Sequence, residues 1–149
     1  AYYREKNYKF CSFLDGDKRG CQKQHIETIK KALETRLDHT DELFISMMQK
    51  RLKYLPGTTW PEKHLIEELK NDAKFEYLIS WGISDDEIKS YCTEALQAGE
   101  HNEFHSLAQN LGKDRNSVFD DVCKQYAITH KDIVDDLGKQ IEELLDNHE

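Results

Sequence analysis

The chain has 149 residues, of which 38% are hydrophobic and 34% are charged, and its net charge at pH 7 is −8. This composition predicts one domain with a moderate hydrophobic core. The negative charge argues against a general nucleic-acid binder, because phosphate binding requires an excess of Lys and Arg. No apolar run is long enough to span a membrane, and no signal peptide is recognisable. Because the first residue is Ala1 rather than Met, we expect a processed protein or a domain excised from a larger one.

The charge is unevenly distributed along the chain. Residues 1–75 carry 15 basic and 12 acidic side chains, whereas residues 76–149 carry 6 and 17. An acidic half of this kind is typically a solvated surface, and it is also a candidate binding surface for a basic partner. Four cysteines without a Cys-x-x-Cys pair favour a reducing, cytoplasmic compartment, with a secreted protein as the alternative.

Residues 1–20 are rich in aromatic side chains. Tyr3, Phe10 and Leu14 follow helical spacing, and Asp15-Gly16 can end the segment, so we expect a short helix. The same run could instead form a short strand that turns at Asp15-Gly16. Its aromatic residues are expected to pack on the next helix, and Tyr3 and Phe10 are candidates for contact with a partner protein.

Residues 22–55 predict one long helix, because they contain no Gly or Pro and Pro56-Gly57 closes the segment. At about 1.5 Å per residue it would be roughly 50 Å long, so the later helices are expected to pack along it. The polar Thr40 interrupts the stripe and marks a candidate bend or pocket, which makes it a candidate binding position. The stripe consists of Ile26, Ile29, Leu33, Leu37, Thr40, Phe44, Met47, Met48 and Leu55.

Shorter helices are expected from residue 60 to residue 145. Thr59 with Glu62, Ser84 with Glu87, and Thr129 with Asp132 have capping-box spacing, and Asp114 can cap a further helix. Gly99 and Gly112 are expected to end two of the helices. The sequence therefore predicts an all-α fold, a bundle of about six to seven helices packed along the helix of residues 22–55 in a single domain, residues 1–149.

Two groups of residues are minority candidates for metal binding. Cys11, Cys21 and His25 resemble a three-Cys, one-His zinc finger from which one cysteine is missing, whereas a closed zinc site needs four ligands. His101 and His105 stand four residues apart, which places both on one face of an expected helix, but they do not form the His-Glu-x-x-His motif. We therefore favour no metal and no cofactor.

No catalytic motif is evident in the sequence. Cys92 and Cys123 lie in apolar helical stripes and are expected to be small buried hydrophobic side chains. Their acidic surroundings would raise a thiol pKa, which disfavours a nucleophilic cysteine. A glycine-rich phosphate loop, a Gly-x-Ser-x-Gly elbow and an EF-hand loop are absent from the sequence. The prediction is a protein that is not an enzyme.

Two functions remain open. The first is a non-catalytic helical protein–protein interaction domain, expected to be part of a larger protein, with no general nucleic-acid binding and a partner that could be basic. Its candidate binding residues are Tyr3, Phe10, Thr40, Phe44, Met47, Met48, Asp120, Asp121, Asp135 and Asp136. The second is a secreted helical carrier of an apolar small molecule or lipid. Its cavity would be lined by Phe44, Met47, Met48, Phe75, Tyr91 and Phe104.

Residues 81–98 resemble the repeat units of the nematode polyprotein lipid-binding allergens. This resemblance implies lipid binding and a helical fold. It covers less than a fifth of the chain and depends on helix-capping residues that many helical proteins share. It therefore does not assign the chain to that family.

Overall fold

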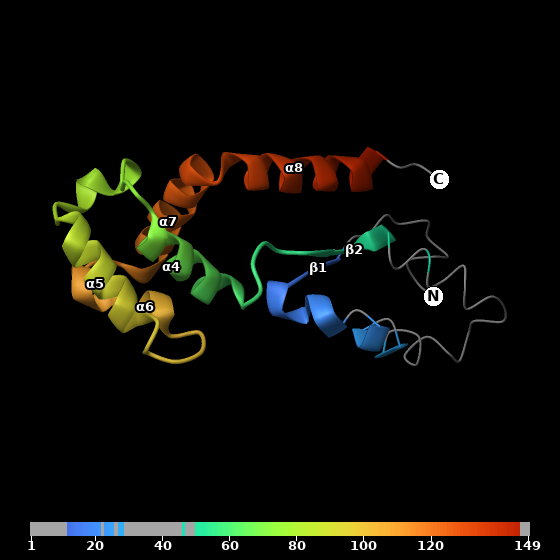
Figure 1. The fold of residues 1–149 in the computed structure, drawn as a ribbon, viewed down its shortest axis with the longest axis horizontal. Helices are drawn as coiled ribbons and strands as arrows, with labels where there is room; N and C mark the ends of the chain where they lie inside the picture. Colours follow the sequence, from blue (N-terminus) through green and yellow to red (C-terminus); the bar gives the residue numbers. More distant parts are fainter. Residues whose placement is uncertain (1–11, 22, 26, 29–45, 47–49, 147–149) are drawn as a thin grey trace. The chain divides into compact units, whose positions relative to one another are not determined.

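The computed structural model describes residues 12–21, 23–25, 27–28, 46 and 50–146. These residues form seven helices, two of them 3₁₀ helices, and two short strands, so the predicted all-α class is confirmed (Figure 1). The chain divides into two compact units, Ala1–Thr58 with Gly138–Glu149, and Thr59–Leu137. The single-domain organisation stays a prediction.

The first unit contains a small parallel sheet. Strand β1 (Ser12–Leu14) pairs with strand β2 (Leu52–Tyr54), with Ser12 opposite Leu52 and Leu14 opposite Tyr54. The 3₁₀ helix η1 (Gly16–Cys21) follows β1 directly. A Cβ atom at Gly16 would lie 2.5 Å from the carbonyl oxygen of Gly57, so only glycine fits at this position.

Two predictions in the first unit are wrong in part. Residues 12–14 form a strand rather than a helix, which agrees with the alternative interpretation of this segment. Residues 23–25, 27–28, 46, 50 and 51 are helical, in agreement with the predicted helix of residues 22–55, but residues 52–54 form a strand and do not continue it. Each strand provides hydrogen-bond partners for the backbone N–H and C=O groups of the other. The pairing is not evident from the sequence, because the two segments are far apart along the chain. The central part of that helix, residues 29–45 and 47–49, lies outside the described residues.

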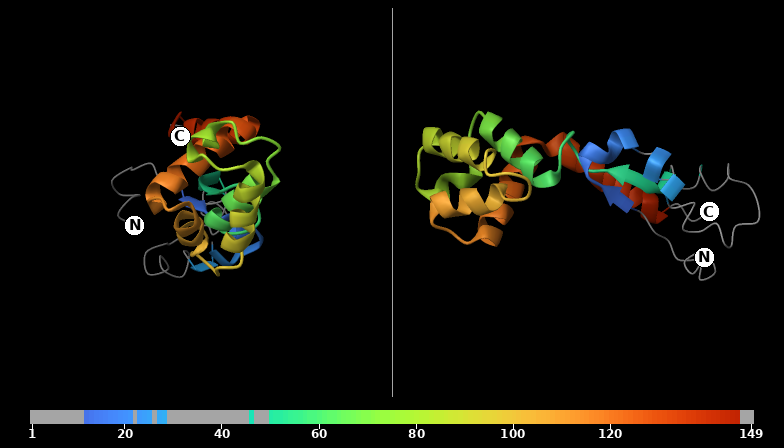
Figure 2. Two further views of the ribbon diagram at one scale, coloured as in Figure 1. Left: turned by 90° about the vertical axis from the view of Figure 1, so that its left-hand side faces the viewer. Right: turned by 90° about the horizontal axis from the view of Figure 1, so that it is seen from below.

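The second unit is a closed ring of four helices. They are α4 (Pro61–Asn71), α5 (Asp85–Ala95), α6 (Glu103–Leu111) and α7 (Arg115–Thr129). Helices α4 and α6 each pack against both α5 and α7, as two further views show (Figure 2). The 3₁₀ helix η2 (Tyr77–Trp81) packs on α7. The apolar faces of the ring form one core, made of Ile66, Leu69, Phe75, Leu78, Trp81, Ile88, Cys92, Ala95, Phe104, Leu107, Ala108, Val118 and Val122.

Helix α8 (Lys131–Asp146) is one continuous helix that follows α7 after a single residue, His130. No helix among the described residues is long and apolar enough to cross a membrane.

The caps observed in the structure can be compared with the helix boundaries predicted from the sequence. The capping box of Ser84 and Glu87 is confirmed at the start of α5, and Asp114 caps α7 by accepting from the Ser117 N–H at 3.0 Å. Gly112 ends α6 with a φ of 62°, as predicted. Two predicted caps are wrong, because α4 starts after Trp60, and Thr129 belongs to the end of α7.

Candidate functional site

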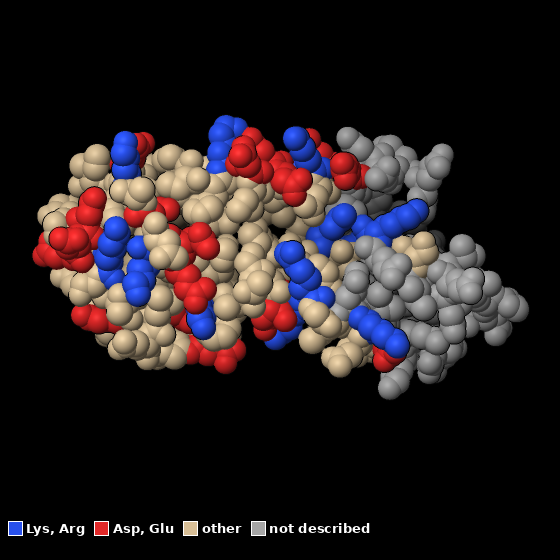
Figure 3. Space-filling model, viewed as in Figure 1, with Lys and Arg blue, Asp and Glu red and all other residues tan. Residues whose placement is uncertain are grey.

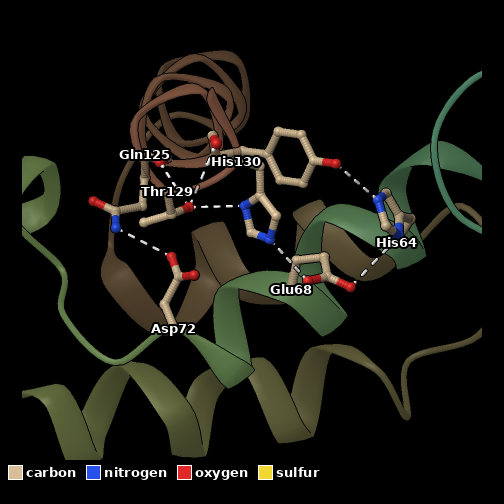
Figure 4. A network of polar contacts seen from close by, with 7 residues as sticks. His64, Glu68, Asp72, Gln125, Thr129 and His130 are labelled. Carbon is tan, nitrogen blue, oxygen red and sulfur yellow. Dashed lines mark hydrogen bonds and ion pairs between the residues drawn. The ribbon is translucent and has the colours of Figure 1, made fainter. Parts of the chain in front are cut away.

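A network of polar side chains joins α4 to α7 (Figure 4). We call it the α4–α7 polar network, and it consists of His64, Glu68, Asp72, Gln125, Tyr126, Thr129 and His130. Each helix contributes residues spaced by four, and this spacing places them on one face of a helix. The network therefore joins one polar edge of α4 to one polar edge of α7.

Gln125 is the buried member of the network, with 1% of its surface exposed. Its amide nitrogen donates to Asp72 Oδ2 at 3.1 Å and to the Lys74 carbonyl oxygen at 2.8 Å. Its amide oxygen accepts from the Tyr77 backbone N–H at 3.0 Å. Both N–H donors and the oxygen of the Gln125 amide are thus hydrogen-bonded. Gln125 therefore links the segment between α4 and η2 to α7.

Burial shifts the pKa of three groups in the network. Burial raises the pKa of Asp72, and the hydrogen bond from Gln125 opposes this shift. Burial lowers the pKa of His64, and the Glu68 carboxylate opposes it. Burial also raises the pKa of the Tyr126 phenol, and Glu68 adds to this effect. His64 Nε2 lies 3.1 Å from the Tyr126 hydroxyl, a contact that a neutral imidazole satisfies in either tautomer.

Thr129, His130 and Glu68 are arranged like the groups that activate a hydroxyl nucleophile. Thr129 Oγ1 lies 2.8 Å from His130 Nδ1, and His130 Nε2 lies 3.0 Å from Glu68 Oε2. However, Thr129 Oγ1 also lies 3.1 Å from the carbonyl oxygen of Gln125, the usual partner of a threonine hydroxyl in a helix. Thr129 ends α7, where the negative end of the helix dipole would destabilise a developing oxyanion. We therefore interpret these groups as an attachment of the α7–α8 corner to α4.

A second polar contact joins the start of α4 to the start of α6. The Trp60 indole N–H donates to Glu103 Oε1 at 2.7 Å. Glu103 is only 2% exposed, and its second oxygen, Oε2, has no hydrogen-bond partner. This pair was not predicted from the sequence, although a partly buried tryptophan usually has an acceptor for its N–H. Trp81 likewise donates to Asp121 Oδ2, at 2.9 Å.

The predicted acidic residues do not form one cluster of unpaired carboxylates. Asp120 forms an ion pair with Lys124, and Asp121 accepts from Trp81. Asp135 pairs with Lys131 on α8, and Asp136 is exposed on the same helix. The two acidic pairs therefore lie on different helices, and the α7 pair is largely engaged within the chain.

The other predicted binding residues are only partly described. Tyr3, Phe10, Thr40, Phe44, Met47 and Met48 lie outside the described residues. Phe75 and Phe104 belong to the packed core, and Tyr91 is partly buried against it. The cavity suggested by these aromatic residues therefore stays a prediction.

The described residues contain no group of three His, Cys, Asp or Glu side chains that could hold a metal ion. His101 precedes α6 in a turn with a φ of 63°, and its ring faces Glu62 and Glu100 at 3.5 and 3.6 Å. His105 is exposed on α6. The expected pair of histidines on one helical face is therefore wrong. Cys21 and His25 are half-buried, and Cys11 lies outside the described residues.

Cys92 and Cys123 are free thiols, and neither is suited to nucleophilic chemistry. Cys92 is fully buried, and burial raises its pKa to about 12. Burial and the Asp120 carboxylate raise the pKa of the half-buried Cys123. The predicted buried role is confirmed for Cys92, and Cys123 is more accessible than expected.

Helix α8 carries apolar side chains that remain exposed. Ile133 is 42% exposed, Val134 is 36% exposed and Ile141 is 41% exposed. The helix also contains six acidic residues and two lysines. Acidic and basic side chains gather along its outer edge (Figure 3). An amphipathic helix with an uncovered apolar face is a typical protein-binding element.

Comparison with protein-family models, curated proteins and solved structures finds no match for this chain.

Proposed function

We propose that this chain is a non-catalytic protein-interaction domain, and that α8 binds a basic amphipathic helix of its partner. The observation that carries the proposal is the apolar stripe of α8, in which Ile133, Val134 and Ile141 are exposed and Leu137 is partly buried. Val134, Leu137 and Ile141 follow the alternating spacing of three and four residues that coiled-coil seams use. At about 100° per residue, all four side chains fall within an arc of roughly 100°.

The charge of α8 supports a basic partner over a second copy of the chain. With six acidic residues and two lysines, α8 has a net charge of −4. Two such helices would repel each other, whereas a helix rich in Lys and Arg would be attracted. Asp135 and Glu142 stand at one border of the stripe, within reach of long basic side chains. We prefer α8 to α7 because Asp121 of α7 accepts a hydrogen bond from the Trp81 indole N–H, whereas the Asp135–Lys131 ion pair of α8 is exposed and can be exchanged for a basic side chain of the partner.

The absence of catalysis is part of the same proposal. The Thr129 hydroxyl lies at the negative end of a helix, and the Cys92 thiol is buried with a pKa raised to about 12. Both facts support an interaction domain over an enzyme. The few cysteines also support a reducing, cytoplasmic compartment, which we propose for the protein.

The experiment measures binding to a fluorescent peptide of about three heptads, with apolar residues at positions a and d and Lys at e and g. We expect wild-type protein to bind this peptide, with an affinity that falls as salt rises. A twin peptide with Glu at e and g should not bind. The double variant Val134→Ser/Ile141→Ser should lose binding, because it removes exposed apolar surface while leaving the core intact.

The matched control is Lys139→Ser, on the opposite face of α8. It should bind the basic peptide at least as well as wild type. Equal binding of the two peptides, or unchanged binding by the double variant, would contradict the proposal. A stable dimer of the wild-type chain in light scattering would contradict the preference for a basic partner over a second copy.

A further inference from the structure

Two histidines share one carboxylate where the end of α7 meets α4 (Figure 4). His130 Nε2 lies 3.0 Å from Glu68 Oε2, and His64 Nδ1 lies 4.0 Å from Glu68 Oε1. Both imidazoles also contact the Tyr126 ring, with centroids 4.3 Å away for His130 and 5.6 Å away for His64. The side chains of His64 and His130 are only 14% and 19% exposed, so water gives a positive charge there little support.

Other charged groups surround the two histidines, and all of them belong to the unit Thr59–Leu137. The ionisable side chains that face the two imidazoles, or flank them along the chain, are Lys63, Glu67, Glu68 and Asp72 of α4 and its C-cap, Tyr126 of α7, and Lys131 and Asp132 of α8. Glu67 forms an ion pair with Lys63 at 3.8 Å, and Asp72 accepts from Gln125 at 3.1 Å. Within the described residues, Glu68 is the one carboxylate that lies within 4.0 Å of either imidazole.

One carboxylate compensates one imidazolium ion in this site, but not two. The first proton, on either histidine, gives an ion pair with Glu68. The second proton places two positive charges against the same carboxylate and the same tyrosine ring, and like charges disfavour each other. Burial lowers the pKa of His64, His130 adds to this shift, and Glu68 opposes it. The folded state therefore binds the second proton less readily than the unfolded chain does, so this attachment weakens as pH falls.

The last turn of α7 depends on the attachment more than the first half of the helix does. Val118 and Val122 belong to the hydrophobic core, whereas residues 127–129 are exposed. His130 then joins α7 to α8 as a single connecting residue, and its carbonyl oxygen accepts from the N–H groups of Ile133 and Val134. Segments with few buried apolar contacts open at a lower free energy than the core of the same domain. Loss of the polar attachment is therefore expected to open this segment before the core.

We propose that the α7–α8 corner, residues 127–134, is a pH-sensitive attachment, which is released from α4 when His64 and His130 are both protonated. The four-helix core stays folded during this release. The pH range lies just below about 6.5, where histidine side chains ordinarily gain their charge. The release frees the start of α8, yet it requires no partner, so it stands whether or not α8 binds a basic helix.

Amide hydrogen exchange followed by NMR measures this opening residue by residue, once each rate is corrected for the intrinsic effect of pH. Between pH 7 and pH 5 we expect the protection factors of the backbone N–H groups of His130, Ile133 and Val134 to fall by about fivefold or more. The protection factors of Val118 and Val122 should fall by less than about twofold, because the core remains closed.

Three variants test the roles of the charged groups. His64→Gln can still hydrogen-bond to the Tyr126 hydroxyl but cannot take up a proton, so the corner should stay protected at pH 5. Glu68→Gln removes the shared carboxylate, so opening should begin with the first proton and the fall in protection should exceed that of wild type. His105→Gln, at an exposed position of α6, is the matched control and should behave like wild type.

The ring resonances of His64 provide a second measurement that does not depend on amide exchange. His130→Gln should move the titration midpoint of His64 to higher pH, because the nearby His130 lowers the pKa of His64 in the wild-type chain. An unchanged midpoint would overturn the proposal, since it would show that the two imidazoles do not interact. Equal losses of protection at Val122 and at Val134, unchanged protection of Val134 down to pH 5, or the same loss in His64→Gln as in wild type would also overturn it.

Discussion

Replacing Gln125 with Glu should be severely destabilising, although the two side chains have nearly the same shape. The substitution keeps the oxygen that accepts from the Tyr77 N–H. It replaces the amide nitrogen with an oxygen that would face Asp72 Oδ2 at 3.1 Å and the Lys74 carbonyl at 2.8 Å. Two donated hydrogen bonds are lost, and two carboxylates meet in a site that is almost inaccessible to water.

The magnitude follows from these contacts. A lost hydrogen bond costs about 1 kcal/mol, and the bond to the Asp72 carboxylate costs about 2 kcal/mol. Two charges about 3 Å apart repel by roughly 5 kcal/mol at an effective dielectric constant of about 20, an upper bound that proton uptake reduces. We therefore expect Gln125→Glu to lower the free energy of unfolding by about 4 kcal/mol or more at pH 7. Gln125→Met, which loses the hydrogen bonds but adds no charge, should cost about 3 kcal/mol.

The assay is urea denaturation followed by circular dichroism at pH 7 and pH 4. At the lower pH either Asp72 or the introduced carboxyl group can hold a proton and donate it to the other, so the difference in stability between Gln125→Glu and Gln125→Met should shrink. Gln109→Glu, at an exposed position of α6, is the control and should change stability by less than about 0.5 kcal/mol. A cost below about 1 kcal/mol for Gln125→Glu, or the same cost at both pH values, would refute this account of the buried amide.

Three further predictions concern the pKa shifts. Burial raises the pKa of Asp72 above its ordinary value of 3.8, so the folded state holds this proton more tightly than the unfolded chain and loses stability as pH rises through that range. Asp72→Asn, which can still accept from Gln125, should therefore raise the urea midpoint at pH 7 and leave it nearly unchanged at pH 3. Burial lowers the pKa of His64 below 6.5, so its stabilising effect is complete above pH 6.5 and is lost as pH falls below it. His64→Gln should flatten the decline in melting temperature between pH 7 and pH 5, whereas the exposed His105→Gln should not. Cys92, with a pKa of about 12, should react with iodoacetamide at pH 8 only after unfolding, and modification of the native protein at this thiol, detected by mass spectrometry, would contradict its burial.

The local features of the second unit could be predicted from the sequence. Ser84 with Glu87, Asp114 and Gly112 mark helix ends through bonds and backbone angles within a few residues of themselves. The spacing of Phe104, Leu107 and Ala108 likewise predicts the buried face of α6. These predictions succeed because capping and helical periodicity are local properties that the chain carries wherever the helix packs.

The contacts between distant segments depended on the tertiary structure. From the sequence, strand β2 is predicted to be the end of a helix. Its parallel pairing with β1 cannot be predicted, because neither segment alone contains a pattern that indicates it. Gln125 looks like an ordinary polar residue of α7 until packing places Asp72 and the Tyr77 N–H around it. Thr129 has the spacing of a helix cap, yet it is the last residue of α7 and its hydroxyl lies close to the Gln125 carbonyl oxygen. In each of these segments the local sequence pattern is compatible with more than one structure. Contacts with residues from elsewhere in the chain determine which structure forms.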